Sequence, residues 1–270
     1  MKKGLLQNGF VLQQPRFLKM RFSVRNRFWW MGETVGLRSH HLCIVIQHEM
    51  SSQEENTMSM KEQMETGKVF IEFGHASEED QAYEKLLDER RRRSKTLCFQ
   101  YNQTDPMNEE QRGKLIHELL GGAGKMPWME APIHFSYGCN TTVGDNFYSN
   151  FNLTIVDDGR VTIGNGVMCA PNVTITSTGH PVHPHYRAKG AQFSLPVVIE
   201  DSVWLGANVV VMPGVTIGKN SVIGAGSVVT RDIPANVVAF GTPCRVIRPI
   251  TDEDLVHIRP GATINEDWNL

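Results

Sequence analysis

The 270-residue sequence has few cysteines, no strong excess of one charge and no long apolar run. Its five cysteines form an odd set without a Cys-x-x-Cys pair, which argues against a disulfide framework and a structural zinc site. A formal net charge of −2 argues against a general nucleic-acid or membrane-surface partner, because such partners require a strong basic excess. No apolar run approaches the ~20 residues of a membrane span, and no secretory signal is recognisable. These absences predict a globular cytoplasmic protein.

Residues 1–57 are rich in Lys and Arg, contain few acidic residues and show no sustained helical or alternating period. We expect this extension to be disordered or to lie outside the fold. Two interpretations stay open. An organelle transit peptide is typically Arg-rich and acid-poor. Alternatively, the gene start is placed too far upstream, since Met58 and Met60 both stand just before recognisable structure.

Residues 58–125 have helical periodicity and are predicted to form a small helical cap. Ser77 precedes three acidic residues, which suits an N-cap at the positive end of a helix dipole, and this helix should run toward Leu97. The run 90-RRRR-93 lies inside this helix. A charge run on a helix is usually a solvated face, and we interpret it so in preference to a phosphate site.

A second helix is predicted in the same segment. Asp105 is expected to be its N-cap, because Pro106 suits the first helical position, and Gly121-Gly122 should end it. Its apolar stripe consists of Leu115, Ile116, Leu119 and Leu120.

Residues 126–250 carry a six-residue repeat. Every sixth residue is apolar or small at Ile199, Leu205, Val211, Ile217, Ile223, Val229 and Ala235. An α-helix would repeat at 3.6 residues and a simple strand at two, so this unit predicts a short strand followed by a turn. If three strands make one coil, residues 18 apart stack at the ~4.8 Å spacing of paired strands, and a parallel solenoid results.

One stretch breaks this repeat and presents three histidines. Residues 176–198 begin 176-TSTGHPVHPHYR-187, and they are predicted to leave the solenoid as an extruded loop. Residues 251–270 follow the repeat as a C-terminal tail.

Five strings of the sequence resemble the maltose/galactoside O-acetyltransferases, which belong to the hexapeptide-repeat acyltransferases. They are 133-IHFSYGCN-140, 147-FYSNFNLTIVDDG-159, 177-STGHPVH-183, 203-VWLGANVVVMPGVTIG-218 and 223-IGAGSVVTRDIPANVVAFGTPCRVIR-248. The resemblance covers about residues 60 to 250. It implies a mainly β fold, a left-handed parallel β-helix with the helical cap and the extruded loop, assembled as a homotrimer. It also implies acetyl transfer from acetyl-CoA to a hydroxyl of a small sugar of maltose, glucose or galactoside type.

The resemblance assigns roles to individual residues. His180 would be the general base, because a neutral imidazole can take the proton of a sugar hydroxyl that attacks a thioester. Asn150 would stabilise the developing oxyanion beside the donor. Ser136 and Asp158 correspond to residues that contact the sugar hydroxyls. Glu72 stands where the family has an aspartate, and this longer side chain leaves the acceptor specificity open.

The donor implied by the resemblance is acetyl-CoA, bound along the coils. Small side chains at Ala207 and Ala225 leave room for the pantetheine arm, and Trp204 would flank the acyl-donor tunnel. Guanidinium groups suit phosphate oxygens. The residues that correspond to the nucleotide end of the site are Thr230, Arg231, Arg245 and Arg248.

Two alternatives stay open. The acceptor could be another hydroxylated molecule. A metal-binding or non-catalytic β-helix of the gamma-carbonic-anhydrase type is the second, because His180, His183 and His185 form a H-x-x-H-x-H pattern. In that class the histidine ligands come from separate coils, and this repeat has no matching histidines on its other coils. We therefore expect no metal.

Overall fold

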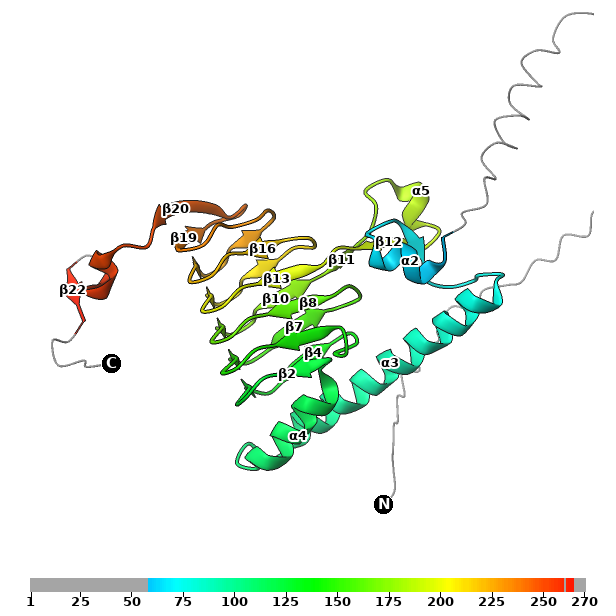
Figure 1. The fold of residues 1–270 in the computed structure, drawn as a ribbon, viewed down its shortest axis with the longest axis horizontal. Helices are drawn as coiled ribbons and strands as arrows, with labels where there is room; N and C mark the ends of the chain where they lie inside the picture. The colour runs from blue at the N-terminus through cyan, green and yellow to red at the C-terminus, as the bar shows by residue number, and fades with distance from the viewer. Residues whose placement is uncertain (1–57, 260, 265–270) are drawn as a thin grey trace, which may run out of the picture. The chain divides into compact units, whose positions relative to one another are not determined.

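The computed structural model describes residues 58–259 and 261–264, so the predictions for residues 1–57 and for the end of the tail lie outside it. Most of the helical residues precede the run of short strands, whereas the short helix α5 interrupts that run (Figure 1). The helices are α2 (Met60–Glu65), α3 (Glu78–Gln103), α4 (Glu109–Leu119) and α5 (Pro184–Arg187). None of the helices in this part of the chain is long and apolar enough to cross a membrane.

Three parallel sheets form the solenoid, and each coil contributes one short strand to each sheet. Sheet I contains β3 (Trp128–Met129), β6 (Tyr148–Ser149), β9 (Met168–Cys169), β14 (Trp204–Leu205), β17 (Val222–Ile223) and β19 (Val237–Phe240), with β20 (Arg245–Pro249) antiparallel at its end. Sheet II contains β4 (Ile133–Phe135), β7 (Leu153–Val156), β10 (Thr174–Thr176), β15 (Val210–Val211) and β18 (Val228–Val229). Sheet III contains β2 (Gly122–Ala123), β5 (Thr141–Val143), β8 (Val161–Ile163), β13 (Val197–Ile199) and β16 (Thr216–Ile217). The mainly β solenoid predicted from the repeat is confirmed.

The repeat residues stack as their spacing predicts. Leu205 pairs with Ile223 in sheet I, and Val211 pairs with Val229 in sheet II. All four side chains are fully buried. Removing such a column from water is the main stabilising term of the coils, at about 1.5–3 kcal/mol for each fully buried aliphatic side chain.

The chain turns from sheet I to sheet II at one corner and from sheet II to sheet III at another, which we call the I–II and II–III corners. Aligned core residues across the I–II corner keep the six-residue spacing, as at Ser149 and Ile155. Across the II–III corner the spacing widens to eight residues between Ile155 and Ile163. The extruded loop leaves at this same corner, between β10 and β13.

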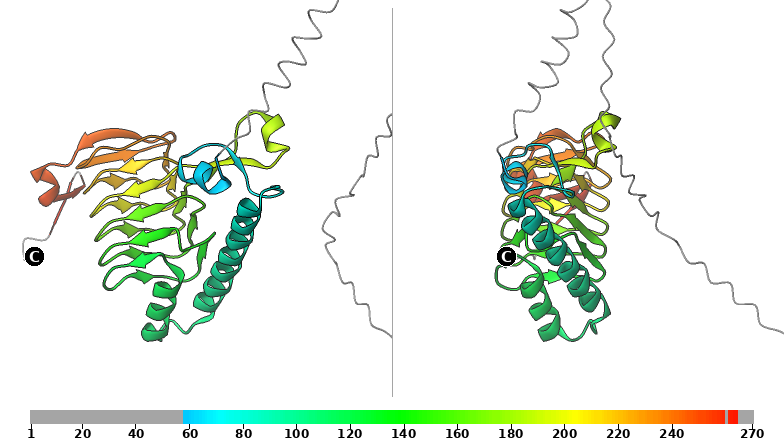
Figure 2. Two further views of the ribbon diagram at one scale, coloured as in Figure 1. Left: turned by 45° about the vertical axis from the view of Figure 1, so that its right-hand side comes forward. Right: turned by 90° about the vertical axis from the view of Figure 1, so that its right-hand side faces the viewer.

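The extruded loop is an ordered hairpin. Its strands β11 (Thr178–Gly179) and β12 (Ala191–Ser194) pair antiparallel, and β12 also pairs antiparallel with β1 (Phe70–Ile71). Helix α5 lies at its tip (Figure 2). The loop therefore joins the N-terminal helical segment to the solenoid through β1.

Helix α3 begins as predicted, since the Ser77 hydroxyl caps it by accepting from the Asp80 N–H. The prediction for α4 was wrong at its start. Asn108 is the N-cap and accepts from the Gln111 N–H at 3.1 Å, and α4 begins at Glu109. Asp105 accepts instead from the Met107 N–H, because a short acidic side chain readily binds the backbone two residues ahead in a turn.

Helices α3 and α4 cover the first coil of the solenoid. Their buried apolar residues, including Tyr101 and Ile116, belong to the same core as the solenoid residues. The Tyr101 hydroxyl donates to the Met129 carbonyl at 2.6 Å, and buried Arg112 donates to that carbonyl at 2.8 Å. At the other end, η1 (Asp252–Leu255), β21 (His257–Arg259) and β22 (Ala262–Thr263) follow the last coil.

Candidate active site

The predicted acceptor residues meet beside the II–III corner, where β1 and the extruded loop approach α3. Glu72 follows β1 and is buried. Its carboxylate accepts from Arg91 of α3, from the Tyr137 hydroxyl at 3.3 Å and from the Gln192 amide at 3.1 Å. The Arg91 guanidinium also donates to the Tyr137 hydroxyl and lies over its ring, 5.1 Å from the centroid. A nearly buried carboxylate is thus held by three donors from three parts of the chain.

Asp158 completes this cluster at the widened turn between β7 and β8. Burial raises its pKa to about 6, and the nearby negative charge of Glu72 adds to the rise, whereas Arg91 opposes it. The same environment raises the pKa of Tyr137, so its hydroxyl stays protonated. The cluster therefore offers one carboxylate that titrates near neutrality and one neutral phenol.

The neighbouring Asp157 has a structural role. It is fully buried and accepts from the Tyr137 N–H at 2.8 Å and from the Thr141 hydroxyl at 2.9 Å. Asn140 donates to the carbonyl of Asp157 at 2.8 Å and to that of Asp158 at 3.3 Å. These bonds hold the turn that presents Asp158.

His180 stands at the base of the extruded loop, directly after β11. Its Nδ1 lies 2.8 Å from the Ala191 carbonyl oxygen. A carbonyl oxygen can only accept, so Nδ1 carries the proton in the neutral ring and Nε2 keeps a free lone pair. Ala191 precedes Gln192 in β12, so adjacent residues of one strand orient His180 and bind Glu72. His180 is thereby linked to the acceptor cluster.

Ser136 lies at the same corner, where its N–H donates to the Ile155 carbonyl at 3.0 Å. Asn150 does not. It lies at the I–II corner between β6 and β7, and its side-chain oxygen accepts from the Phe151 N–H at 2.8 Å. Within one chain the predicted catalytic pair is therefore divided between two corners.

The predicted donor residues are divided in the same way. Ala207 and Ala225 lie at the I–II corner, and Trp204 lies on the outer side of sheet I with 47% of its surface exposed. Thr230 and Arg231 follow β18 at the II–III corner, and both are exposed.

Arg245 and Arg248 lie on β20, beyond the last coil. Arg245 donates to the Cys244 carbonyl at 2.7 Å. Arg248 makes a forked pair with Asp254 at 2.7 and 2.8 Å, and this pair lowers the pKa of Asp254 to about 2. Arg248 therefore already has a carboxylate partner within the chain.

The loop histidines His183 and His185 make edge contacts with each other and with Tyr186. Among residues 58–259 and 261–264, no group of three or more His, Cys, Asp or Glu side chains is arranged to hold a metal ion.

Sequence reasoning missed Arg91, Tyr137 and Gln192. The interpretation of the arginine run as a solvated face was wrong for Arg91, because its side chain is only 24% exposed and faces Glu72. Tyr137 directly follows Ser136 in the string 133-IHFSYGCN-140, and this position beside a predicted acceptor residue could have indicated that Tyr137 belongs to the site. Gln192 had no signal, because its contact with Glu72 spans 120 residues.

Two family profiles match parts of the chain. The profile of the maltose acetyltransferase hexapeptide capping motif matches residues 80–124, and that of bacterial transferase hexapeptide (six repeats) matches residues 196–231. A galactoside O-acetyltransferase of Escherichia coli (strain K12) is 51% identical over 197 residues, which are 73% of this chain and 92% of that protein. A galactoside O-acetyltransferase of Lactococcus lactis is 49% identical over 172 residues, covering 63% and 83%.

Solved structures show the same relationship. A galactoside acetyltransferase in complex with coenzyme A matches with a TM-score of 0.70 at 47% identity, over 78% of this chain and all of that one. A maltose O-acetyltransferase from Clostridium difficile 630 matches with a TM-score of 0.66 at 41% identity, over 73% of this chain and all of that one. The solenoid is the left-handed β-helix of these enzymes, as the resemblance implied. The chain belongs to the maltose and galactoside O-acetyltransferase family of hexapeptide-repeat acyltransferases.

Proposed function

We propose that the protein transfers the acetyl group of acetyl-CoA to a hydroxyl of a small sugar, with His180 as the general base. The observation that carries this proposal is the bond between His180 Nδ1 and the Ala191 carbonyl, which leaves Nε2 as an acceptor. The relatives are galactoside and maltose O-acetyltransferases, and one solved relative holds coenzyme A. An acetyl-CoA-dependent enzyme of this kind is expected to work in the cytoplasm.

The reaction is a direct displacement at the thioester. His180 Nε2 accepts the proton of the sugar hydroxyl while its oxygen bonds to the acetyl carbon. The carbon–sulfur bond then breaks, and the proton returns from the imidazolium to the leaving thiolate. Cys169 does not support a covalent intermediate, because it is fully buried and burial raises its pKa to about 12. Cys139 is half-buried and burial raises its pKa as well.

Glu72 and Asp158 hold the sugar in this proposal. Carboxylate oxygens accept hydroxyl hydrogen bonds that are about twice as strong as those between neutral groups. Glu72 is kept in place by Arg91 and Gln192, so its orientation does not depend on a bound sugar. Ser136 at the same corner adds a hydroxyl.

The division of the site between two corners supports a homotrimer. His180 and Asp158 lie at the II–III corner, whereas Asn150, Ala207 and Ala225 lie at the I–II corner of the same solenoid. If the I–II corner of one subunit faces the II–III corner of the next, the base, the oxyanion donor and the donor channel meet in one cleft. Three such clefts close a ring.

Thiol release from acetyl-CoA in the presence of a sugar panel tests this function. His180→Ala should lower turnover about 10²- to 10⁴-fold, the usual contribution of a general base, with little change in acetyl-CoA affinity. His183→Ala is the matched control, since His183 lies exposed on the same loop. If His180→Ala keeps most of the turnover, the proposed mechanism is wrong.

A further inference from the structure

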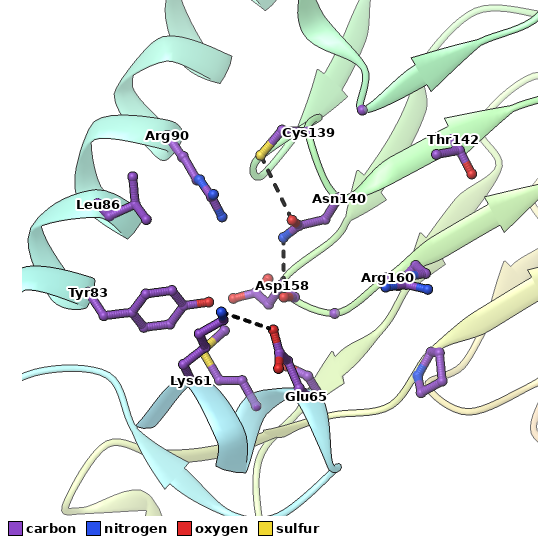
Figure 3. Close-up of a pocket in the computed structure, with 15 residues that line it drawn as sticks. Lys61, Glu65, Tyr83, Leu86, Arg90, Cys139, Asn140, Thr142, Asp158 and Arg160 are labelled. Atoms are coloured by element: carbon purple, nitrogen blue, oxygen red, sulfur yellow. Dashed lines mark hydrogen bonds and ion pairs between the residues drawn. The ribbon is translucent and has the colours of Figure 1, made fainter. Parts of the chain in front are cut away.

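A cavity of about 900 Å³ lies between the N-terminal helices and the II–III corner, and Asp158 forms part of its wall. This volume is in the range of small-molecule sites, roughly 300–1,000 Å³. Helix α2 contributes Lys61, helix α3 contributes Tyr83 and Arg90, and the solenoid contributes Asn140, Asp158 and Arg160 (Figure 3). The proposed reaction uses only Asp158 of these residues.

Arg90 is the member of the arginine run that points into this cavity (Figure 3). The other three have partners within the chain. Arg91 binds Glu72, Arg92 pairs with Asp88 at 2.7 Å, and Arg93 donates to the Glu118 carbonyl. Arg90 is half-buried, and no carboxylate of the described residues lies within 4 Å of it. A partly desolvated guanidinium without a counter-charge favours an anionic ligand.

The charges of the cavity wall also favour an anionic ligand. Lys61 lies 3.9 Å from Glu65, so these two wall charges offset each other. Arg90 and Arg160 then stand against the single carboxylate of Asp158. The Tyr83 hydroxyl and the side-chain oxygen of Asn140 add neutral hydrogen-bonding groups, which suit a ligand that carries hydroxyls as well as a charge.

The cavity adjoins the acceptor cluster at two places. Asp158 lines the cavity and interacts electrostatically with Glu72 and Arg91. Strand β12 runs along both, since Gln192 binds Glu72 and Ser194 lines the cavity. A molecule bound at Glu72 can therefore extend past Asp158 toward Arg90.

We propose that this cavity is a subsite for the anionic part of the acetyl acceptor, bound chiefly by Arg90 with Arg160. The acceptor is then a sugar or glycoside that carries a carboxylate or phosphate on the unit next to the acetylated ring. This inference rests on the proposed function, and it narrows the acceptor to an acidic glycoside.

Lactose and lactobionate are a matched pair of probes, because both present an intact galactosyl ring and only lactobionate has a carboxylate on its second unit. The wild-type enzyme should have a KM for lactobionate about 10- to 100-fold below that for lactose, the usual range for charge-assisted bonds from arginine. Arg90→Gln should remove most of this preference, and Arg160→Gln should reduce it. Arg92→Gln is the control in the same helix and should keep the preference. Each variant's melting temperature shows whether it is folded.

Three results would overturn the subsite. If lactose is acetylated and lactobionate has no advantage, the proposed function stands and the subsite is wrong. If lactobionate binds by calorimetry in an Arg90-dependent way but is not acetylated while lactose is, the cavity binds a separate anion. Inhibition by inorganic phosphate also tests whether the anion and the acceptor share a site. Phosphate that inhibits competitively with lactobionate supports the subsite, and phosphate that inhibits noncompetitively contradicts it. Failure to acetylate either sugar would instead contradict the proposed function.

Discussion

Acidification should weaken acceptor binding through Asp158. Burial raises the pKa of this carboxyl to about 6. With that value, about 90% of Asp158 is ionised at pH 7 and about 10% at pH 5. If only the carboxylate accepts the sugar hydroxyls, the acceptor KM should rise about tenfold over this interval. Protonation of Asp158 should change the KM of the acceptor and not the turnover number, since Asp158 takes no part in the proton transfer proposed for His180.

Initial rates at saturating acetyl-CoA, measured from pH 5 to pH 8, give the acceptor KM of the wild type and of Asp158→Asn. The amide cannot titrate, so Asp158→Asn should have a higher KM at pH 7 that stays nearly constant down to pH 5. Asp252→Asn is the control, because Asp252 is exposed and lies on η1, beyond the last coil. An equal rise of KM in wild type and Asp158→Asn would show that another group titrates.

The same shift predicts a change in stability with a definite sign. The folded-state pKa of Asp158 lies above the unfolded value of 3.8, so folding disfavours the ionised form. The stability contributed by the protonated form is fully present below pH 4 and is lost as the pH rises to about 6. Asp158→Asn should therefore gain about 2 kcal/mol relative to wild type between pH 4 and pH 7. Urea unfolding at the two pH values measures this difference, and a constant difference would refute it.

The remaining predictions concern the cap and the assembly. Asn108→Ala should lower the free energy of unfolding by about 1 kcal/mol through the lost N-cap of α4, whereas Asp105→Ala should cost clearly less. Equal losses in urea titrations would contradict the assignment of Asn108. Activity should depend on assembly into the proposed trimer, because His180 and Asn150 lie at different corners of one chain. Turnover measured against molar mass in a dilution series tests this, and a fully active monomer would contradict it.

The solenoid could be predicted because its signal is local and repeated. Leu205 and Ile223 occupy the same place in successive coils, so one spacing predicts the strand, the turn and the neighbour across the sheet. The capping of α3 at Ser77 was equally local. At α4 the sequence allowed two local interactions for Asp105, an N-cap or a turn. In the structure Asp105 accepts from the Met107 N–H in a turn, and Asn108 is the N-cap.

The acceptor cluster could be predicted only in part, because its contacts join distant segments. Arg91 could not be separated from its three neighbours in the run without knowing that Glu72 follows a strand held by the extruded loop. The four arginines look alike in the sequence, whereas in the structure Arg91, Arg92 and Arg93 have different partners and Arg90 lines the cavity. Only the position of β12 decides that Gln192, and not a neighbouring residue, reaches Glu72.

The irregular spacings of the repeat indicate the position of the candidate site better than the regular six-residue spacings do. From β4 to β13 the steps from sheet III to sheet I and from sheet I to sheet II keep six residues between aligned core positions. The extra residues all fall at the II–III corner. They form the turn with Ser136, the turn with Asp158 and the extruded loop with His180. Strand pairing above and below continues undisturbed, because a corner can lengthen outward while the three sheets keep their register. A solenoid can thus lengthen one corner without loss of its core, and in this chain the lengthened corner carries the residues proposed to bind and activate the acceptor.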